Sequence, residues 1–339
     1  MLRWTALAAA LLALAAGCGG DDGDAGDGGP LTVYSGREEE LVAPLFERFE
    51  EETGIDIEVR YGDSAELAAT IAEEGGNSPA DVFFAQDPGS LGALESQELL
   101  AQLPDSTLNR VDERFRDPDR HWVGTSGRVR VVVYNTEEVS AGELPTSVFD
   151  LTDPEWKGKI GIAPTNASFQ AFVSAMILSL GEDRTREWLE QLQANDPKLY
   201  ERNTPIVEAA ATGEIEVGLV NHYYLYLVKE EQPDAPVANH FLSGDDPGAL
   251  VSVAGAAVLD GSDQEDEARR FVEFLLSDDA QRFYVDEAEE AEYPVVDGID
   301  PKAGLPALDE LGGPQLELDD LGPQLERTLE LLNEVGLTT

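Results

Sequence analysis

The chain has 339 residues and is very acidic: 22 Lys and Arg stand against 69 Asp and Glu, a formal net charge of −47 at pH 7. Nucleic acid and anionic bilayers would be repelled by such a surface, so binding to either is excluded as a principal function. The length is sufficient for two domains with a sizeable core. The acidic residues are spread along the whole chain, which indicates a solvated surface.

The first 30 residues predict export. MLRWTALAAALLALAAGC carries one basic residue, Arg3, then an apolar run too short to span a bilayer, then small residues before Cys18. Cys18 is the only cysteine, so no intramolecular disulfide can form. We expect a signal peptide over 1–17, and a lipidated Cys18 followed by a flexible Gly/Asp-rich tether over 18–30. The protein would then be anchored to the outer face of the cell membrane or be periplasmic. The alternative is an incidental cysteine near an ordinary cleavage site.

Strands and helices are expected to alternate at the start of the body. Short apolar or alternating runs predict strands at 31–36, 55–62 and 79–85. Helical spacing predicts helices at 37–54 and 64–75, the second with Ser64 as its N-cap. This order is typical of a parallel α/β unit.

A second α/β unit follows, and two long strands are expected to cross between the units, at 127–135 and 249–261. Ligand would bind between the domains at the carboxyl ends of strands, and closure would be a hinge motion. We expect one domain from 31–128 and 254–300, and the other from 129–253 and 301–339. The other predicted elements are strands at 158–164 and 214–220 and helices at 165–181, 222–232, 266–287 and 321–336.

The stretch VNHYYLYL contains two adjacent tyrosines, Tyr223 and Tyr224. If Asn221 is the N-cap of the helix after the strand, both tyrosines fall in the first helical turn and can face the cleft. Phenolate oxygen suits a small, highly charged cation, and a metal of charge +3 would ionise both side chains. The alternative is ordinary packing, with the hydroxyl groups in water.

Other polar residues are candidates for an anion site or for ordinary structural roles. TNAS, from Thr165 to Ser168, opens a helix after a strand and would present N–H groups and hydroxyls to an anion, although a plain N-cap is the alternative. Arg128 and Arg130 share one strand face, and one of them could pair with carbonate or phosphate, or both could form surface salt bridges. The weaker candidates are Arg37, for the anion, and His222, for the metal; His121 and His240 lack a partner at metal-ligand spacing.

Seven segments follow one another along the chain: VYSGREEEL, SPADVFFAQD, SGRVRVVVYN, EWKGKIGIAPTNASF, GEIEVGLVNHYYLYL, DPGALVSVAGAAVL and EAEYPV. In this order they resemble the bacterial ferric-ion-binding proteins, the substrate-binding components of iron ABC importers. The resemblance covers about residues 31–339. It implies a type II-like periplasmic binding fold with a two-strand hinge, a monomer that binds and does not catalyse, and permease and ATPase partners.

The resemblance also implies a site. The tyrosine pair of the family falls on Tyr223 and Tyr224, its histidine ligand on Glu38 with Glu39 alongside, and its carboxylate ligand on the neutral Gln86. Gln86 is expected to bond an anion or water. Iron(III) would be held by two phenolates, Glu38, and a synergistic carbonate or phosphate or water, with Arg128 or Arg37 balancing the anion. The anion pocket of the family falls on Thr165, Asn166, Ala167, Ser168, Asn203 and Asn221.

Two other functions stay open. The same fold could bind an organic anion, a phosphonate or a polyamine; the tyrosine pair favours iron, whereas the two changed ligands leave room for the alternative. An exported hydrolase is disfavoured, because the sequence contains no GxSxG elbow and no HExxH motif.

Overall fold

The structure, a computed structural model, describes residues 29–288, 291–308 and 310–338. The predicted signal peptide over 1–17, Cys18 and the tether up to residue 28 lie outside the described residues. In the described part of the chain, no helix is both long and apolar enough to cross a membrane.

Three parallel strands form one end of the sheet. β1 (Leu31–Ser35) pairs in parallel with β2 (Ile57–Tyr61) on one side and β3 (Val82–Ala85) on the other. The crossovers contain α1 (Glu39–Thr53) and α2 (Ser64–Glu74), whose apolar residues recur at helical spacing and are buried. The predicted parallel α/β unit is confirmed.

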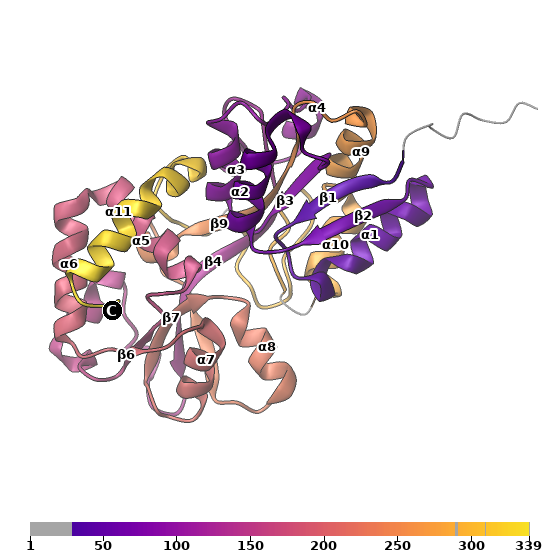
Figure 1. Ribbon diagram of the computed structural model, residues 1–339. Helices are drawn as coiled ribbons and strands as arrows, with labels where there is room; N and C mark the ends of the chain where they lie inside the picture. The colour runs from indigo at the N-terminus through magenta and orange to yellow at the C-terminus, as the bar shows by residue number, and fades with distance from the viewer. Residues whose placement is uncertain (1–28, 289–290, 309, 339) are drawn as a thin grey trace, which may run out of the picture.

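The other elements fall into two groups, which Figure 1 shows as two lobes. Besides β1, β2, β3, α1 and α2, the first lobe contains four more helices: α3 (Pro88–Glu95), α4 (Asp105–Leu108), α9 (Glu265–Leu275) and α10 (Asp278–Asp286). The second lobe contains α5 (Ala167–Leu180), α6 (Glu182–Ala194), α7 (Asn203–Ala211), α8 (Tyr224–Glu231), β5 (Ile160–Ile162), β6 (Lys198–Leu199), β7 (Val217–Asn221) and β8 (Val237–His240).

Two strands run from one lobe into the other: β4 (Val123–Asn135) and β9 (Val251–Val258). β4 pairs with β9 over 123–129 and with β7 and β8 over 130–135, always antiparallel. β9 also pairs with β3 of the first lobe. The strand order among the described residues is β2-β1-β3-β9-β4-β7-β5-β6, with β8 also beside β4. The predicted pair of crossing strands is therefore confirmed.

Each lobe has its own cluster of buried aromatic rings. In the first lobe, Phe271 of α9 contacts Phe46 and Phe49 of α1, with ring centroids 5.5 Å and 5.1 Å apart. In the second, Phe172 of α5 contacts Trp188 of α6 at 5.6 Å. The two aromatic clusters belong to one continuous hydrophobic core, which also includes Val131 and Val133 of β4.

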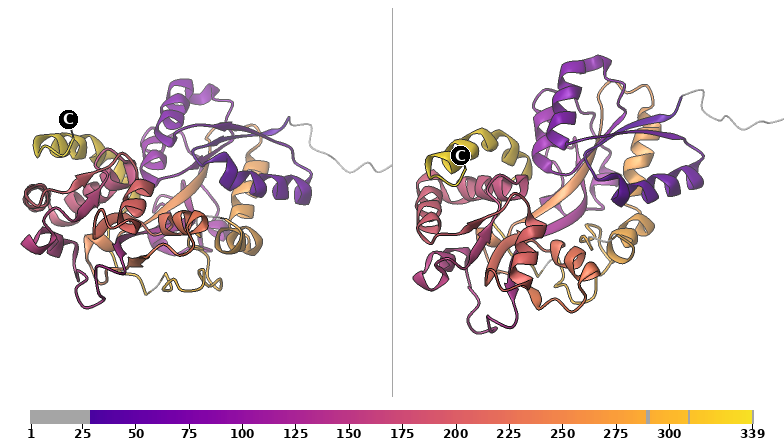
Figure 2. Two further views of the ribbon diagram at one scale, coloured as in Figure 1. Left: turned by 90° about the horizontal axis from the view of Figure 1, so that it is seen from below. Right: turned by 60° about the horizontal axis from the view of Figure 1, so that its bottom comes forward.

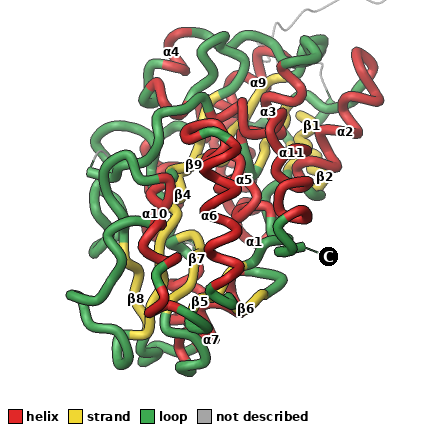
Figure 3. The backbone as a smooth tube through the Cα atoms, turned by 90° about the vertical axis from the view of Figure 1, so that its left-hand side faces the viewer, coloured by secondary structure: helices red, strands yellow, loops and turns green. Residues whose placement is uncertain are grey.

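The last helix, α11 (Leu321–Glu334), packs against both lobes. Its Thr328 shares a buried 2.7 Å hydrogen bond with Ser174 of α5, and its N-terminal end lies against α3. That approach is close, because a Cβ on Gly89 of α3 would come within 2.9 Å of the Gly322 nitrogen. Figures 2 and 3 show α11 alongside α5 at the edge of the second lobe.

Three local predictions were wrong. Ser64 is not the cap of α2; Asp63 is, because its carboxylate accepts from the N–H groups of Ala65 and Glu66. Asn221 is the last residue of β7 and does not cap α8, which begins at Tyr224. The helix expected over 266–287 is two helices, α9 and α10, because Ser277 starts a new one by accepting from the Ala280 N–H.

Candidate functional site

The two adjacent phenols converge. Tyr223 lies in the turn after β7, and Tyr224 is the first residue of α8. Their ring centroids are 4.3 Å apart, and the Tyr223 hydroxyl donates to the Tyr224 hydroxyl at 3.2 Å. Tyr223 is buried, whereas Tyr224 is partly exposed. The turn between strand and helix thus brings both oxygens to one point, which a straight strand or helix would not do.

His222, the residue before the tyrosine pair, bonds two backbone groups through its ring. It is fully buried; its Nδ1 accepts from the Val129 N–H at 3.2 Å, and its Nε2 donates to the Ala291 carbonyl at 3.1 Å. Burial lowers the pKa of His222 to about 4, so the neutral Nε2–H tautomer fits both hydrogen bonds. Both ring nitrogens of His222, the weaker candidate for the metal, are therefore bonded to backbone groups.

A network of small polar side chains lies at the start of α5. Asn166 is the N-cap of this helix, and its Oδ1 accepts from the Ser168 N–H, the Ser168 hydroxyl and the Asn203 amide, at 3.0, 2.7 and 3.0 Å. Asn203 is fully buried and also donates to the Ser168 hydroxyl at 3.1 Å. The expected cap is present, and it brings Asn166, Ser168 and Asn203 together.

Thr165 and Ala167 border this network and are exposed. Asn221 is buried at the end of β7, where it pairs with Arg130 in the register of β4 and β7. The predicted anion-pocket residues therefore come from the α5 N-terminus, the start of α7 and the end of β7, all in the second lobe.

Arg130 joins the network to the tyrosine pair. Its guanidinium donates to the Ser168 hydroxyl at 3.2 Å and to the Leu219 carbonyl at 3.0 Å, and it lies over the ring of Phe172. Burial lowers the pKa of Arg130, whereas the nearby phenols of Tyr224 and Tyr223 raise it. Within the described residues Arg130 has no carboxylate partner, so its buried charge has no protein anion to balance it.

The predicted first-lobe ligands differ from one another in solvent exposure. Glu38 precedes α1 and Glu39 is its first residue; both side chains are exposed. Gln86 follows β3 and is partly buried, with its N–H bonded to the Ser64 hydroxyl at 2.9 Å. Glu39 affects a neighbouring phenol, because burial and then the charges of Glu39 and Glu40 raise the pKa of Tyr61 to about 12.

Arg128 and Arg37 are not surface ion-pairing residues; both are buried. Arg128 donates to the Gln86 carbonyl, which links β4 to the end of β3. Arg37 donates to Glu292 at 2.7 Å and to the Ser126 hydroxyl at 3.1 Å. Both arginines, which the sequence suggested for an anion, thus contact first-lobe groups.

Sequence reasoning missed Glu292, whose side chain is 1% exposed. It is buried against Arg37 and accepts a 2.7 Å hydrogen bond from Ser126. Burial would raise the pKa of Glu292, but the charges of Arg37 and Arg128 and hydrogen bonds from Arg37 and Ser126 hold it below its usual value. Nothing local distinguishes this glutamate from the many solvated acids of the chain.

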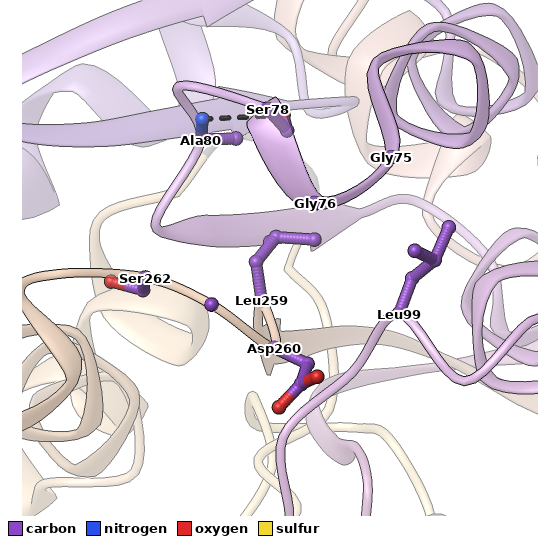
Figure 4. Close-up of a pocket in the computed structure, with 9 residues that line it drawn as sticks. Gly75, Gly76, Ser78, Ala80, Leu99, Leu259, Asp260 and Ser262 are labelled. Carbon is purple, nitrogen blue, oxygen red and sulfur yellow. Dashed lines mark hydrogen bonds between the residues drawn. The ribbon is translucent and has the colours of Figure 1, made fainter.

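A small enclosed cavity lies elsewhere, between the α2–β3 connection and the residues after β9 (Figure 4). Its volume is about 10 Å³, room for one water at most. None of the predicted site residues lines it. Its lining residues are Gly75, Gly76, Ser78, Ala80, Leu99, Leu259, Asp260, Gly261 and Ser262.

Comparison with known proteins gives one consistent answer. Residues 77–310 match the family described as bacterial extracellular solute-binding protein. The major ferric iron-binding protein of Neisseria meningitidis serogroup B is 35% identical over 91% of this chain and 93% of that protein.

Two solved structures share the whole fold. Iron-bound HitA from Pseudomonas aeruginosa is 36% identical with a TM-score of 0.83, and IdiA (FutA) from Trichodesmium, in complex with iron and citrate, is 30% identical with a TM-score of 0.80. Each alignment covers 91% of this chain and 100% of the other. On this similarity, the chain belongs to the ferric-ion-binding proteins of the bacterial extracellular solute-binding family.

Proposed function

We propose that this protein captures ferric iron between its two lobes and delivers it to a membrane permease of an ABC importer. The observation that carries the proposal is the convergence of Tyr223 and Tyr224 beside Arg130. Phenolate oxygens are hard anionic donors, and a trivalent cation would displace the phenolic protons. The names of the relatives, which bind iron, support the same ligand.

Charge balance suggests how the coordination is completed. Two phenolates and Glu38 supply three negative charges, which match ferric iron. A synergistic carbonate or phosphate would add negative charge, and Arg130 is the buried cation best placed to balance it, with Ser168 and Asn203 as further donors. Gln86 would then bond the anion or a water.

The organisation of the chain fits delivery at a membrane. A signal peptide over 1–17 and a lipidated Cys18 would export and anchor the protein, and the residues up to 30 would act as a leash. We infer one domain from 31–128 and 254–300 and another from 129–253 and 301–339, hinged at β4 and β9. A monomer with one iron would present itself to permease and ATPase subunits.

Residues of both lobes give some support to a second class of ligand. By the resemblance to the family, Glu38 stands where a histidine ligand is expected and Gln86 where a carboxylate ligand is expected. Arg130, Ser168 and Asn203 suit an oxyanion. An organic anion or phosphonate held by these donors would need no phenolate. The tyrosine pair favours iron over this alternative, and over a polyamine, which would be repelled by Arg130.

The test is a titration of the purified protein with ferric citrate, followed in the visible spectrum, with and without carbonate and phosphate. We expect a phenolate-to-iron charge-transfer band that saturates at one iron per protein and depends on the anion. No band, together with a rise in melting temperature given by a phosphonate, an organic acid or a polyamine, would refute iron and assign the fold to an organic solute.

A further inference from the structure

A cluster of carboxylates and one imidazole lies away from the tyrosine pair, where α3, the turn before β4 and the C-terminal segment meet. Glu95, Asp117 and His121 each place one oxygen or nitrogen within 4.8 Å of the others. Glu95 is the last residue of α3, and the turn from Asp117 to His121 leads into β4. Asp319, from the short 3-10 helix Leu318–Asp320 ahead of α11, lies beside them.

Asp117 is the fixed centre of the cluster. It is 2% exposed, and its Oδ2 accepts from the His121 backbone N–H at 2.6 Å and faces His121 Nδ1 at 3.2 Å. The same Nδ1 lies 3.5 Å from Glu95 Oε1. Asp117 Oδ1 is also buried, yet it accepts no hydrogen bond from any described residue. A buried carboxylate oxygen with no donor is costly, which points to an unidentified cation.

Asp319 repeats this feature. Its Oδ1 is buried and accepts no hydrogen bond within the described part of the chain. The backbone is pressed close here, since a Cβ on Gly92 of α3 would come within 2.8 Å of the Asp319 Cβ. Asp117 and Asp319 thus each have one buried carboxylate oxygen without a donor among the described residues.

The charges do not balance. No ion pair among the described residues brings a lysine or arginine to Glu95, Asp117 or Asp319. Three carboxylates thus repel one another around a single imidazole that carries at most one positive charge.

We propose that Glu95, Asp117 and His121 bind a divalent transition cation of the zinc or manganese class, where α3 of the first lobe packs against the segment that leads into α11. Imidazole nitrogen together with carboxylate oxygen is a donor set suited to these ions. Asp319 leads directly into α11, which packs on α5 of the second lobe. The cation would therefore stabilise the connection that α11 makes between the lobes, at a point distinct from β4 and β9.

The test uses the purified full chain, freed of metal with a chelator and titrated with Zn²⁺ or Mn²⁺ by calorimetry, with Mg²⁺ and Ca²⁺ as comparators. We expect one saturable site that prefers the transition ions. Glu95→Gln, Asp117→Asn and His121→Gln should each weaken cation binding at least about tenfold. Loss of a residue that only supports a ligand already costs about 10- to 100-fold in metal affinity. His240→Gln and Glu155→Gln, which remove a histidine and an exposed acid of the second lobe, should leave it unchanged.

Two controls keep the outcome decisive. Glu95 is partly exposed, so Glu95→Gln should fold even if Asp117→Asn does not. The Tyr223→Phe/Tyr224→Phe variant should keep the site, because none of its ligands is a tyrosine. Hydrogen exchange of residues 318–334 should slow when the cation binds. Loss of binding in the tyrosine variant, binding that survives Glu95→Gln and His121→Gln, or only weak non-saturable uptake by the acidic surface would overturn the proposal.

Discussion

The two sides of the candidate iron site differ in how firmly they are built. In the second lobe, Tyr223, Arg130 and Asn203 are buried and the polar groups around them are hydrogen-bonded to one another. In the first lobe, Glu38 and Glu39 are exposed at the start of α1. A preorganised side loses little conformational entropy on binding, whereas exposed carboxylates must be ordered. We infer that the second lobe determines the ligand and that the exposed acids of the first lobe contribute less.

The largest effect should come from the tyrosine pair. Replacing Tyr223 and Tyr224 together by Phe removes both phenolate donors but keeps the rings and their packing. Ferric affinity should fall roughly 1,000-fold or more, equivalent to about 4 kcal/mol, and the charge-transfer band should disappear. Tyr226→Phe, which removes a nearby half-buried phenol, is the matched control and should keep both. Undiminished binding in the double variant would show that the second lobe does not hold the iron.

The next prediction concerns the stability of the first lobe, not iron binding. Glu292→Gln leaves the buried Arg37 without this carboxylate and should destabilise the fold by about 3–5 kcal/mol at neutral pH, as measured by denaturant unfolding. The pKa of Glu292 is held below its usual 4.5 in the folded state, so its contribution is present above that value and lost as pH falls through the lower folded pKa. The gap between wild type and variant should therefore narrow in acid. A gap independent of pH would contradict the charged state assigned to Glu292.

A smaller effect separates the two neighbouring arginines of β4. Arg130→Met removes the charge beside Ser168 and the phenols, so ferric affinity should fall about 10- to 100-fold and lose its dependence on carbonate or phosphate. Arg128→Met removes a contact to the Gln86 carbonyl and should leave the anion dependence intact. Equilibrium titrations at several anion concentrations distinguish them. The reverse ranking would return the anion to Arg128, where the sequence first suggested it.

The smallest effect is expected from the exposed acids. Glu38→Gln should weaken ferric binding by no more than about tenfold, or 1.4 kcal/mol, because an exposed carboxylate is ordered only on binding and water can replace it. Glu39→Gln, one residue further along, should change affinity less. A loss for Glu38→Gln as large as that for the tyrosine pair would mean that the two sides of the site contribute equally.

The fold could be predicted from the sequence because its signals are periodic and local. Apolar spacing located β1, α1 and the crossing strands, with boundaries off by a few residues. The errors arose where two residues compete for one role. Asp63 and Ser64 are both good caps, and the carboxylate is the one that bonds two N–H groups. The sequence predicts Asn221 as a helix cap, yet strand pairing with Arg130 keeps it in β7.

The site was harder to predict because burial and charge balance depend on contacts distant in sequence. Arg128 and Arg130 share one strand face and cannot be ranked from local pattern. Their partners, Gln86 in the first lobe and Ser168 in the second, come from segments on either side of β4 in the chain. Glu292 gave no signal for the same reason, because its partner Arg37 lies 255 residues away. Only the fold brings such pairs together.

The most direct test of the account is anomalous diffraction at the iron edge from crystals grown with ferric iron and carbonate. We expect a single iron peak within bonding distance of both Tyr223 and Tyr224 oxygens, with the anion against Arg130 and Ser168. Iron bound elsewhere, or bound through Glu38 and Gln86 without the phenols, would contradict the claim that the second lobe determines the ligand.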